Sequence, residues 1–260
     1  DGVTLWTESY DRADAALLAI EADIARAVAT AIAGRLLPEE RTALAARATR
    51  NPEAYDHFLR GNFSLAQRTP VGVRRAMNEY TAAARLDPGL AQAEARVAYG
   101  YALYLDWGWQ DFGIPSDSML ERGFRSANRA LAIDSACSDA WMSLGYLRSF
   151  RDQRAYAGVM PAMERAVALD PRNAEAWHQY SSLLGNAGRF EESVAASQHA
   201  LALEPQAISL YSLAGVLEVM RRDDEARRFV DSTLAVDPTF YAAYFSRSWW
   251  RLRHGDVPGA

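Results

Sequence analysis

Apolar residues recur at helical spacing along most of the 260-residue chain. The spacing is clear in residues 12–36, where one apolar face is made by Leu17, Ile20, Ile24, Val28 and Ile32. Because a helical turn takes three to four residues, this pattern predicts an amphipathic helix. Residues 1–10 alternate instead and are rich in β-branched and aromatic types, which predicts a strand. A lone strand needs a sheet, so we interpret both elements as the end of an α/β domain that lies upstream.

From residue 51 onward the helical pattern is interrupted at regular intervals by one short phrase. An apolar residue, an acidic residue and a proline recur at Leu86-Asp87-Pro88, Leu169-Asp170-Pro171, Leu203-Glu204-Pro205 and Val236-Asp237-Pro238. Pro171 and Pro205 are 34 residues apart, and Pro205 and Pro238 are 33 residues apart. Proline ends a helix, so this period predicts an array of helix–turn–helix repeats.

Each predicted first helix carries a bulky residue and, further along, a small one. The bulky residues are Tyr55, Trp141, Trp177, Leu210 and Tyr244. The small residues are Ala98, Gly145, Ser181, Ala214 and Ser248. A bulky side chain that enters a hole left by small residues lets neighbouring helices interlock.

These residues resemble the tetratricopeptide repeat over roughly residues 52–260. The resemblance implies an all-α fold, a right-handed superhelix of stacked helix pairs whose inner wall is lined by the first helix of each pair. Residues 1–50 are then the remnant of the upstream domain, namely its last strand and linker helices. The predicted repeats are 52–90, 91–137, 138–173, 174–207, 208–240 and a partial repeat at 241–260.

The front of the chain carries a second resemblance. Leu5-Trp6-Thr7-Glu8-Ser9-Tyr10-Asp11-Arg12, together with residues 20–25 and 51–55, is similar to the junction between a TolB-like α/β domain and tetratricopeptide repeats in bacterial multidomain signalling proteins. In that family the module further upstream is a class III adenylate/guanylate cyclase, a winged-helix DNA-binding domain or a protein kinase. Nothing in these 260 residues distinguishes the three.

Composition narrows the chemistry open to this segment. The net charge is −5, which argues against a nucleic-acid-binding surface. All 28 basic residues are arginine, so a Schiff-base lysine and a phosphate-loop lysine are both excluded. The single cysteine, Cys137, excludes an intrachain disulfide and a multi-cysteine zinc site. No apolar run is long enough to span a membrane, and we expect a cytoplasmic setting.

No constellation of catalytic residues is present in the sequence. Phosphate loops, glycine fingerprints and the common hydrolase motifs are all missing. His178 and His199 fall on the two helices of one repeat, but His199 is expected to face outward, so we do not predict a metal site. Cys137 has no basic neighbour and is expected to be inert. We therefore predict no enzymatic activity, no cofactor and no metal for this segment.

A peptide-binding groove is the predicted functional site. In each first helix, the residues one and five positions after the bulky residue should point into it. Together with nearby polar residues, this predicts Arg60, Arg96, Tyr99, Met142, Tyr146, His178, Asn186, Tyr211, Phe245 and Trp249. Capture of a C-terminal carboxylate is disfavoured because the chain lacks lysine. Aromatics with a few arginines suit a peptide with apolar anchors, although the aromatics could instead pack between repeats.

The sequence therefore predicts a non-catalytic scaffold or sensor arm of a larger bacterial signalling protein, with a protein or peptide partner in its groove. The alternative is the regulatory region of a class III adenylate/guanylate cyclase, or of a winged-helix transcriptional regulator. Tyr244, Phe245, Trp249 and Trp250 have no covering helix in the sequence, which predicts either self-association through the open C-terminal end or a C-terminal extension. The aromatic insertion at 106–112 is either a contact patch or, as we favour, a segment folded back on the array.

Overall fold

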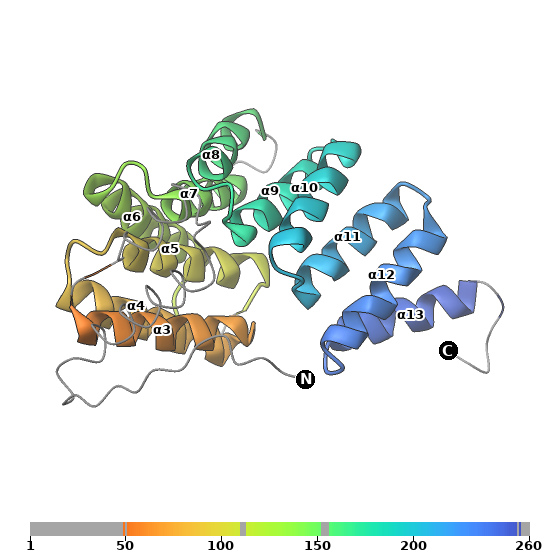
Figure 1. Cartoon of the computed structure of the whole chain (residues 1–260), viewed down its shortest axis with the longest axis horizontal. Helices are drawn as coiled ribbons and strands as arrows, with labels where there is room; N and C mark the ends of the chain where they lie inside the picture. Colours follow the sequence, from red (N-terminus) through yellow and green to blue (C-terminus); the bar gives the residue numbers. More distant parts are fainter. Residues whose placement is uncertain (1–48, 50, 110–112, 152–155, 254, 256–260) are drawn as a thin grey trace, which may run out of the picture.

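A computed structural model describes residues 49, 51–109, 113–151, 156–253 and 255, and all regular structure in this part of the chain is α-helical (Figure 1). The helices are α3 (Pro52–Ala66), α4 (Pro70–Leu86), α5 (Ala91–Asp106), α6 (Ser116–Ile133), α7 (Ser138–Arg151), α8 (Tyr156–Leu169), α9 (Ala174–Asn186), α10 (Phe190–Leu203), α11 (Ala207–Val219), α12 (Asp223–Val236) and α13 (Tyr241–Arg253). The all-α prediction is confirmed for these residues. The strand and helix predicted within 1–36 lie outside them.

Consecutive helices pack as pairs, and the pairs follow one another in chain order along a curved array (Figure 1). The first helices also pack on each other: α5 contacts α7, and α7 contacts α9. One continuous core runs from α3 to α10 and includes the fully buried rings of Tyr80, Tyr99 and Tyr104. Smaller clusters join α10, α11, α12 and α13. The array is therefore most extensively packed in its N-terminal part.

The acidic residue of the recurring phrase closes the turn between two helix pairs. In three of the four copies of the phrase, the side chains of Asp87, Asp170 and Asp237 accept a hydrogen bond from the backbone N–H two residues on, at 2.8–3.0 Å. Asp134, which is followed by a serine in place of the proline, accepts the same bond at 2.8 Å. This local bond is the usual reason for aspartate in a turn. Asp87, Asp134 and Asp237 are also the extended residues that directly follow a helix, and the next helix begins a few residues later. The phrase thus marks a turn that its own side chain stabilises.

The bulky and small residues of the first helices hold the pairs together. Trp141 and Trp177 are half-buried, and each indole N–H donates to a backbone carbonyl six residues earlier, at 2.8 and 3.0 Å. The bulky residue therefore ties each helix to the turn before it. Close packing is visible at Gly61, where an added Cβ would lie 2.4 Å from a ring carbon of Tyr80 on α4.

Candidate functional site

Two clefts lie along the side of the array that the first helices share. The larger, about 970 Å³, is lined mainly by the turns between helix pairs, and we call it the turn cleft. The smaller, about 670 Å³, is lined by α5, α7, α9 and α11, and we call it the helix cleft. Arg68, Trp107 and Ile208 line both clefts. These three residues therefore lie at the boundary between the two clefts.

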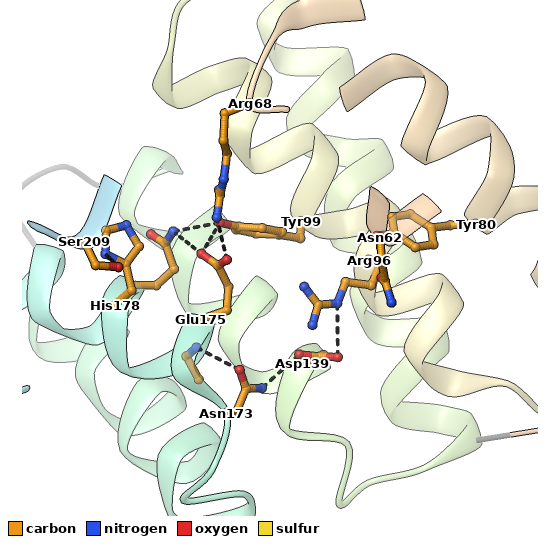
Figure 2. A network of polar contacts seen from close by, with 12 residues as sticks. Asn62, Arg68, Tyr80, Arg96, Tyr99, Asp139, Asn173, Glu175, His178 and Ser209 are labelled. Carbon is orange, nitrogen blue, oxygen red and sulfur yellow. Dashed lines mark hydrogen bonds and ion pairs between the residues drawn. The ribbon is translucent and has the colours of Figure 1, made fainter. Parts of the chain in front are cut away.

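Arg68 connects the first helix pair to the fourth across this boundary (Figure 2). It lies between α3 and α4 with a φ of 50°, a left-handed conformation that is uncommon for a residue other than glycine. Its guanidinium donates to a carboxylate oxygen of Glu175 on α9 at 2.5 Å and to the hydroxyl of Tyr99 on α5 at 2.8 Å. The Tyr99 hydroxyl donates in turn to Glu175 at 2.5 Å, and Gln179 donates to Tyr99 at 2.8 Å. We call Arg68, Tyr99, Glu175 and Gln179 the clasp.

The clasp carries a buried charge pair that changes the pKa of its neighbours. Burial alone raises the pKa of Glu175, but the charge of Arg68 and the hydrogen bond from Tyr99 outweigh it and lower that pKa to about 2. Burial lowers the pKa of the adjacent His178 to about 4, against the attraction of Glu175. His178 is therefore neutral near pH 7, and its Nδ1 lies 3.2 Å from the hydroxyl of Ser209 on α11.

A second polar group joins α5, α7 and α9 next to the clasp (Figure 2). The Arg96 Nε donates to Asp139 at 3.2 Å, and the side-chain amide of Asn173 donates to the other oxygen of Asp139 at 2.9 Å. The Asn173 side-chain oxygen also accepts from the backbone N–H of Ala176 at 3.0 Å and so caps the start of α9. These bonds fix the positions of three successive first helices.

The comparisons with known proteins agree with this architecture. A family model described as "Tetratricopeptide repeat" matches residues 162–195. The structure is similar to a thermophilic TPR protein of Thermus thermophilus, with a TM-score of 0.59 and 18% identity over 76% of this chain and 99% of that one. It is also similar to PilF of Pseudomonas aeruginosa, with a TM-score of 0.53 and 20% identity over 64% of this chain and 69% of that one. The chain folds as a tetratricopeptide-repeat superhelix.

A curated relative extends the comparison beyond the fold. "Putative adenylate cyclase 3" of Rhizobium meliloti (strain 1021) is 29% identical to this chain over 101 residues. The match covers 38% of the tetratricopeptide-repeat chain but only 17% of the length of the relative.

Four of the predicted groove residues are buried in the superhelix. Tyr99 and Met142 have no exposed surface, and Tyr146 and His178 are 6% exposed. Tyr99 belongs to the clasp, whereas Tyr146 and His178 lie along the helix cleft. Tyr146 and His178 are thus largely buried and also border the helix cleft, and contact of any of the four with a partner stays a prediction.

The other predicted groove residues are spread over different surfaces. Asn186 lines the helix cleft and Arg96 lines the turn cleft. Arg60 borders neither cleft. Its guanidinium pairs with Asp56 at 2.5 Å and with Glu79, on the second helix of its own pair, at 3.2 Å. Tyr211 is half-buried beside Phe240, while Phe245 and Trp249 on α13 are 73% and 56% exposed. A contact between any of these residues and a partner stays a prediction.

Sequence reasoning missed the residues that carry the polar network. Asp139 and Glu175 occupy the same place in successive repeats, two residues before the bulky tryptophan. Extending the repeat alignment by that one position would have found both. Arg68 has no comparable signal, since it lies in a turn and its partner is 107 residues away.

Other candidates from the sequence form no site in the part of the chain that the structure covers. No group of three or more His, Cys, Asp or Glu among its described residues could hold a metal ion. His199 is exposed and lies beside Trp177, with the ring centroids 4.3 Å apart and the ring planes tilted by 49°. Cys137 is buried, which raises the pKa of its thiol to about 12. None of the described helices has the length and apolar character needed to cross a bilayer.

The aromatic insertion after α5 is packed against the array as far as it is described. Trp107 lies beside Trp109 with ring centroids 5.4 Å apart, and Trp109 meets Tyr104 edge-on at 5.2 Å. Both tryptophans are half-buried against the main core. The rest of the insertion, residues 110–112, falls outside the described residues.

Proposed function

We propose that this tetratricopeptide-repeat array is a non-catalytic scaffold or sensor arm of a larger bacterial signalling protein and that it binds a peptide segment in the helix cleft. The observation that carries this proposal is the cleft itself, about 670 Å³ and lined by four successive first helices. A preformed, partly apolar pocket of this size is typical of a binding site.

The lining of the helix cleft suits an apolar anchor. Its lining includes small residues on α9 and α11, namely Ser182, Gly185, Ser212 and Gly215, of which Ser182 and Gly215 occupy matching places in successive repeats. Aromatic side chains from Trp107, Tyr146 and Phe150 border one side, and Val216 and Val219 border the other. Small residues give depth, and aromatic residues dominate the energetics of protein interfaces. The cleft can therefore accept a bulky side chain of a partner between two apolar walls.

Gly215→Leu tests the proposal by filling the cleft. A Cβ at Gly215 meets no atom within 4 Å, and leucine favours the helix more than glycine does, so the fold is expected to persist. Peptides selected on the wild-type chain by phage display should lose at least about tenfold in affinity for the variant, a loss of about 1.4 kcal/mol. Isothermal titration calorimetry measures the change.

Gly158→Leu is the matched control for this substitution. Gly158 also lies in a helix, has open space around its Cβ and borders neither cleft. Peptide affinity should therefore survive Gly158→Leu. Selected peptides that bind the Gly215→Leu chain as tightly as the wild type would contradict binding in the helix cleft.

A second candidate function follows from the curated relative. The array would then be the regulatory region of a class III adenylate/guanylate cyclase whose catalytic domain lies upstream. Such a protein would place the array in the cytoplasm, where the nucleotide substrate is found. The match to a putative adenylate cyclase supports this candidate over a winged-helix regulator. The reading frame before Asp1, followed by a cyclic-nucleotide assay of the whole protein with and without Gly215→Leu, tests it. An upstream DNA-binding domain would favour the winged-helix alternative.

A further inference from the structure

Asp106 is an acidic residue in an unfavourable place. It is the last residue of α5, where the helix dipole disfavours a negative charge. Asp106 is exposed on the side that borders the helix cleft, and partial desolvation there raises its pKa, against the opposing effect of the nearby Tyr146 hydroxyl. No ion pair of Asp106 with a basic side chain occurs among the described residues. Its charge is thus held at the cleft without a cation to balance it.

The rest of the cleft leaves this charge uncompensated. Among the described residues that line it, Arg68 and Asp106 are the two with charged side chains near pH 7. Arg68 is already committed to Glu175 and Tyr99 in the clasp. His178 also borders the cleft, but burial lowers its pKa to about 4 and leaves it neutral. The cleft therefore presents an excess of negative charge to a ligand.

Aromatic residues line the helix cleft together with Asp106. Trp107 follows this residue directly in the chain, and the Tyr146 hydroxyl is close enough to act on the pKa of Asp106. Phe150 lies next to Tyr146, with ring centroids 5.3 Å apart, and borders the same cleft. Aromatic faces attract cations, and this attraction grows when water is excluded. A carboxylate among aromatic rings is suited to a side-chain ammonium or guanidinium, whereas one carboxylate is too few for a metal ion.

We propose that the helix cleft recognises a lysine or arginine side chain of a peptide partner, with Asp106 accepting its hydrogen bond and an apolar neighbour of that residue occupying the floor beside Gly215. This inference rests on the proposed function and names the chemistry of its ligand. The cation balances the negative charge at the end of α5. The apolar side chain of the neighbouring peptide residue packs against the small residues of the cleft.

The test compares three capped, fluorescently labelled pentapeptides that carry one central residue between leucines. The central residue is arginine, citrulline or glutamate, and citrulline keeps the shape of arginine without its charge. Each peptide is titrated by fluorescence anisotropy into the wild-type chain and into Asp106→Asn. The arginine peptide should bind the wild type about tenfold more tightly than the citrulline peptide, and the glutamate peptide should bind most weakly.

Asp106→Asn should remove the preference for arginine, so that the arginine peptide binds this variant about tenfold more weakly than it binds the wild type. Its fold should be unaffected, since the substitution removes a charge that the helix end disfavours, and the melting curve by circular dichroism checks this. Asp117→Asn is the matched control, because Asp117 is an exposed acid on α6 that borders neither cleft. The arginine preference should survive in the control.

The remaining outcomes separate this inference from the proposed function. Equal binding of the arginine and citrulline peptides, with both abolished by Gly215→Leu, overturns the cation site but leaves peptide binding in the cleft intact. An arginine peptide that binds Gly215→Leu as well as the wild type overturns both. Absence of binding by the arginine peptide at about 1 mM also overturns the inference.

Discussion

At the scale of single residues, loss of one partner of the buried ion pair in the clasp should lower the stability of the array most. The side chains of Arg68 and Glu175 are 16% and 10% exposed, and removing one partner leaves the other charge buried without compensation. Glu175→Gln should therefore destabilise the array by about 3 kcal/mol. The midpoint of urea unfolding measures this change.

Glu192→Gln is the matched control for Glu175→Gln. Glu192 pairs with Arg189 three residues earlier at 2.6 Å, but both side chains are well exposed. An exposed pair contributes less than about 1 kcal/mol, so the urea midpoint should barely move. Similar losses in the two variants would contradict the importance of the clasp.

His178 makes stability depend on pH. Its pKa falls from 6.5 to about 4 on folding, so the unfolded chain binds the proton first as the pH drops. The stabilisation by neutral His178 is complete above pH 6.5 and is lost between pH 6.5 and pH 4, by about 3 kcal/mol at about 1.4 kcal/mol per unit. Glu175 adds a loss of the same sign below pH 4.5, since its pKa is lowered to about 2.

His178→Gln isolates the histidine contribution. Glutamine does not titrate and can still hydrogen-bond to Ser209, so the decrease in stability between pH 6.5 and pH 4 should largely disappear. Denaturant unfolding at a series of pH values measures the slope. An unchanged slope would assign the pH dependence to groups other than His178.

At the scale of the elements, the turns between helix pairs have a simple chemical basis. Asp170 accepts a hydrogen bond from the backbone N–H of Arg172, so Asp170→Ala should lower stability by about 1 kcal/mol. Glu204 occupies the same place in the next turn, but its longer side chain forms no such bond among the described residues. Glu204→Ala is therefore the natural control, and its thermal midpoint should stay close to that of the wild type.

The elements were predictable from the sequence because their causes are local. The acid–proline phrase contains both the hydrogen bond of the turn and the residue that ends the helix, and Trp141 and Trp177 contact carbonyls only six residues away. Which side chains face the groove was less predictable from the sequence. Whether Tyr99 faces solvent or a buried carboxylate depends on how closely the first and fourth helix pairs approach, and no periodicity in the chain encodes that distance.

At the scale of the whole molecule, the clasp restrains the curvature of the superhelix. Arg68 holds the turn between α3 and α4 against α9, although the two are not neighbours in the array (Figures 1 and 2). Arg68→Ala should therefore let the first helix pair move away from the fourth. Small-angle X-ray scattering should show an increased radius of gyration, and the boundary between the two clefts should open.

Arg221→Ala is the matched control for this change of shape. Arg221 lies in the corresponding turn between α11 and α12 and also has a positive φ, 61°. Alanine retains the Cβ, so Arg221→Ala removes a turn side chain at a similar positive-φ position without affecting the clasp. A radius of gyration that increases equally in both variants would attribute the expansion to the backbone of the turns rather than to the bond with Glu175.

The bond between Arg68 and Glu175 also affects the order in which the helices unfold. A repeat array in which each unit contacts only its neighbours unfolds progressively from its ends. Here the first unit is tied to the fourth, so the turn between α3 and α4 cannot leave the array without breaking a bond to α9. The segment from α3 to α9 is therefore expected to open as one cooperative block, while α11 to α13 exchange their amide hydrogens earlier. Arg68 thus adds a contact between the first and fourth helix pairs to an array in which packing is otherwise mainly between neighbouring helices.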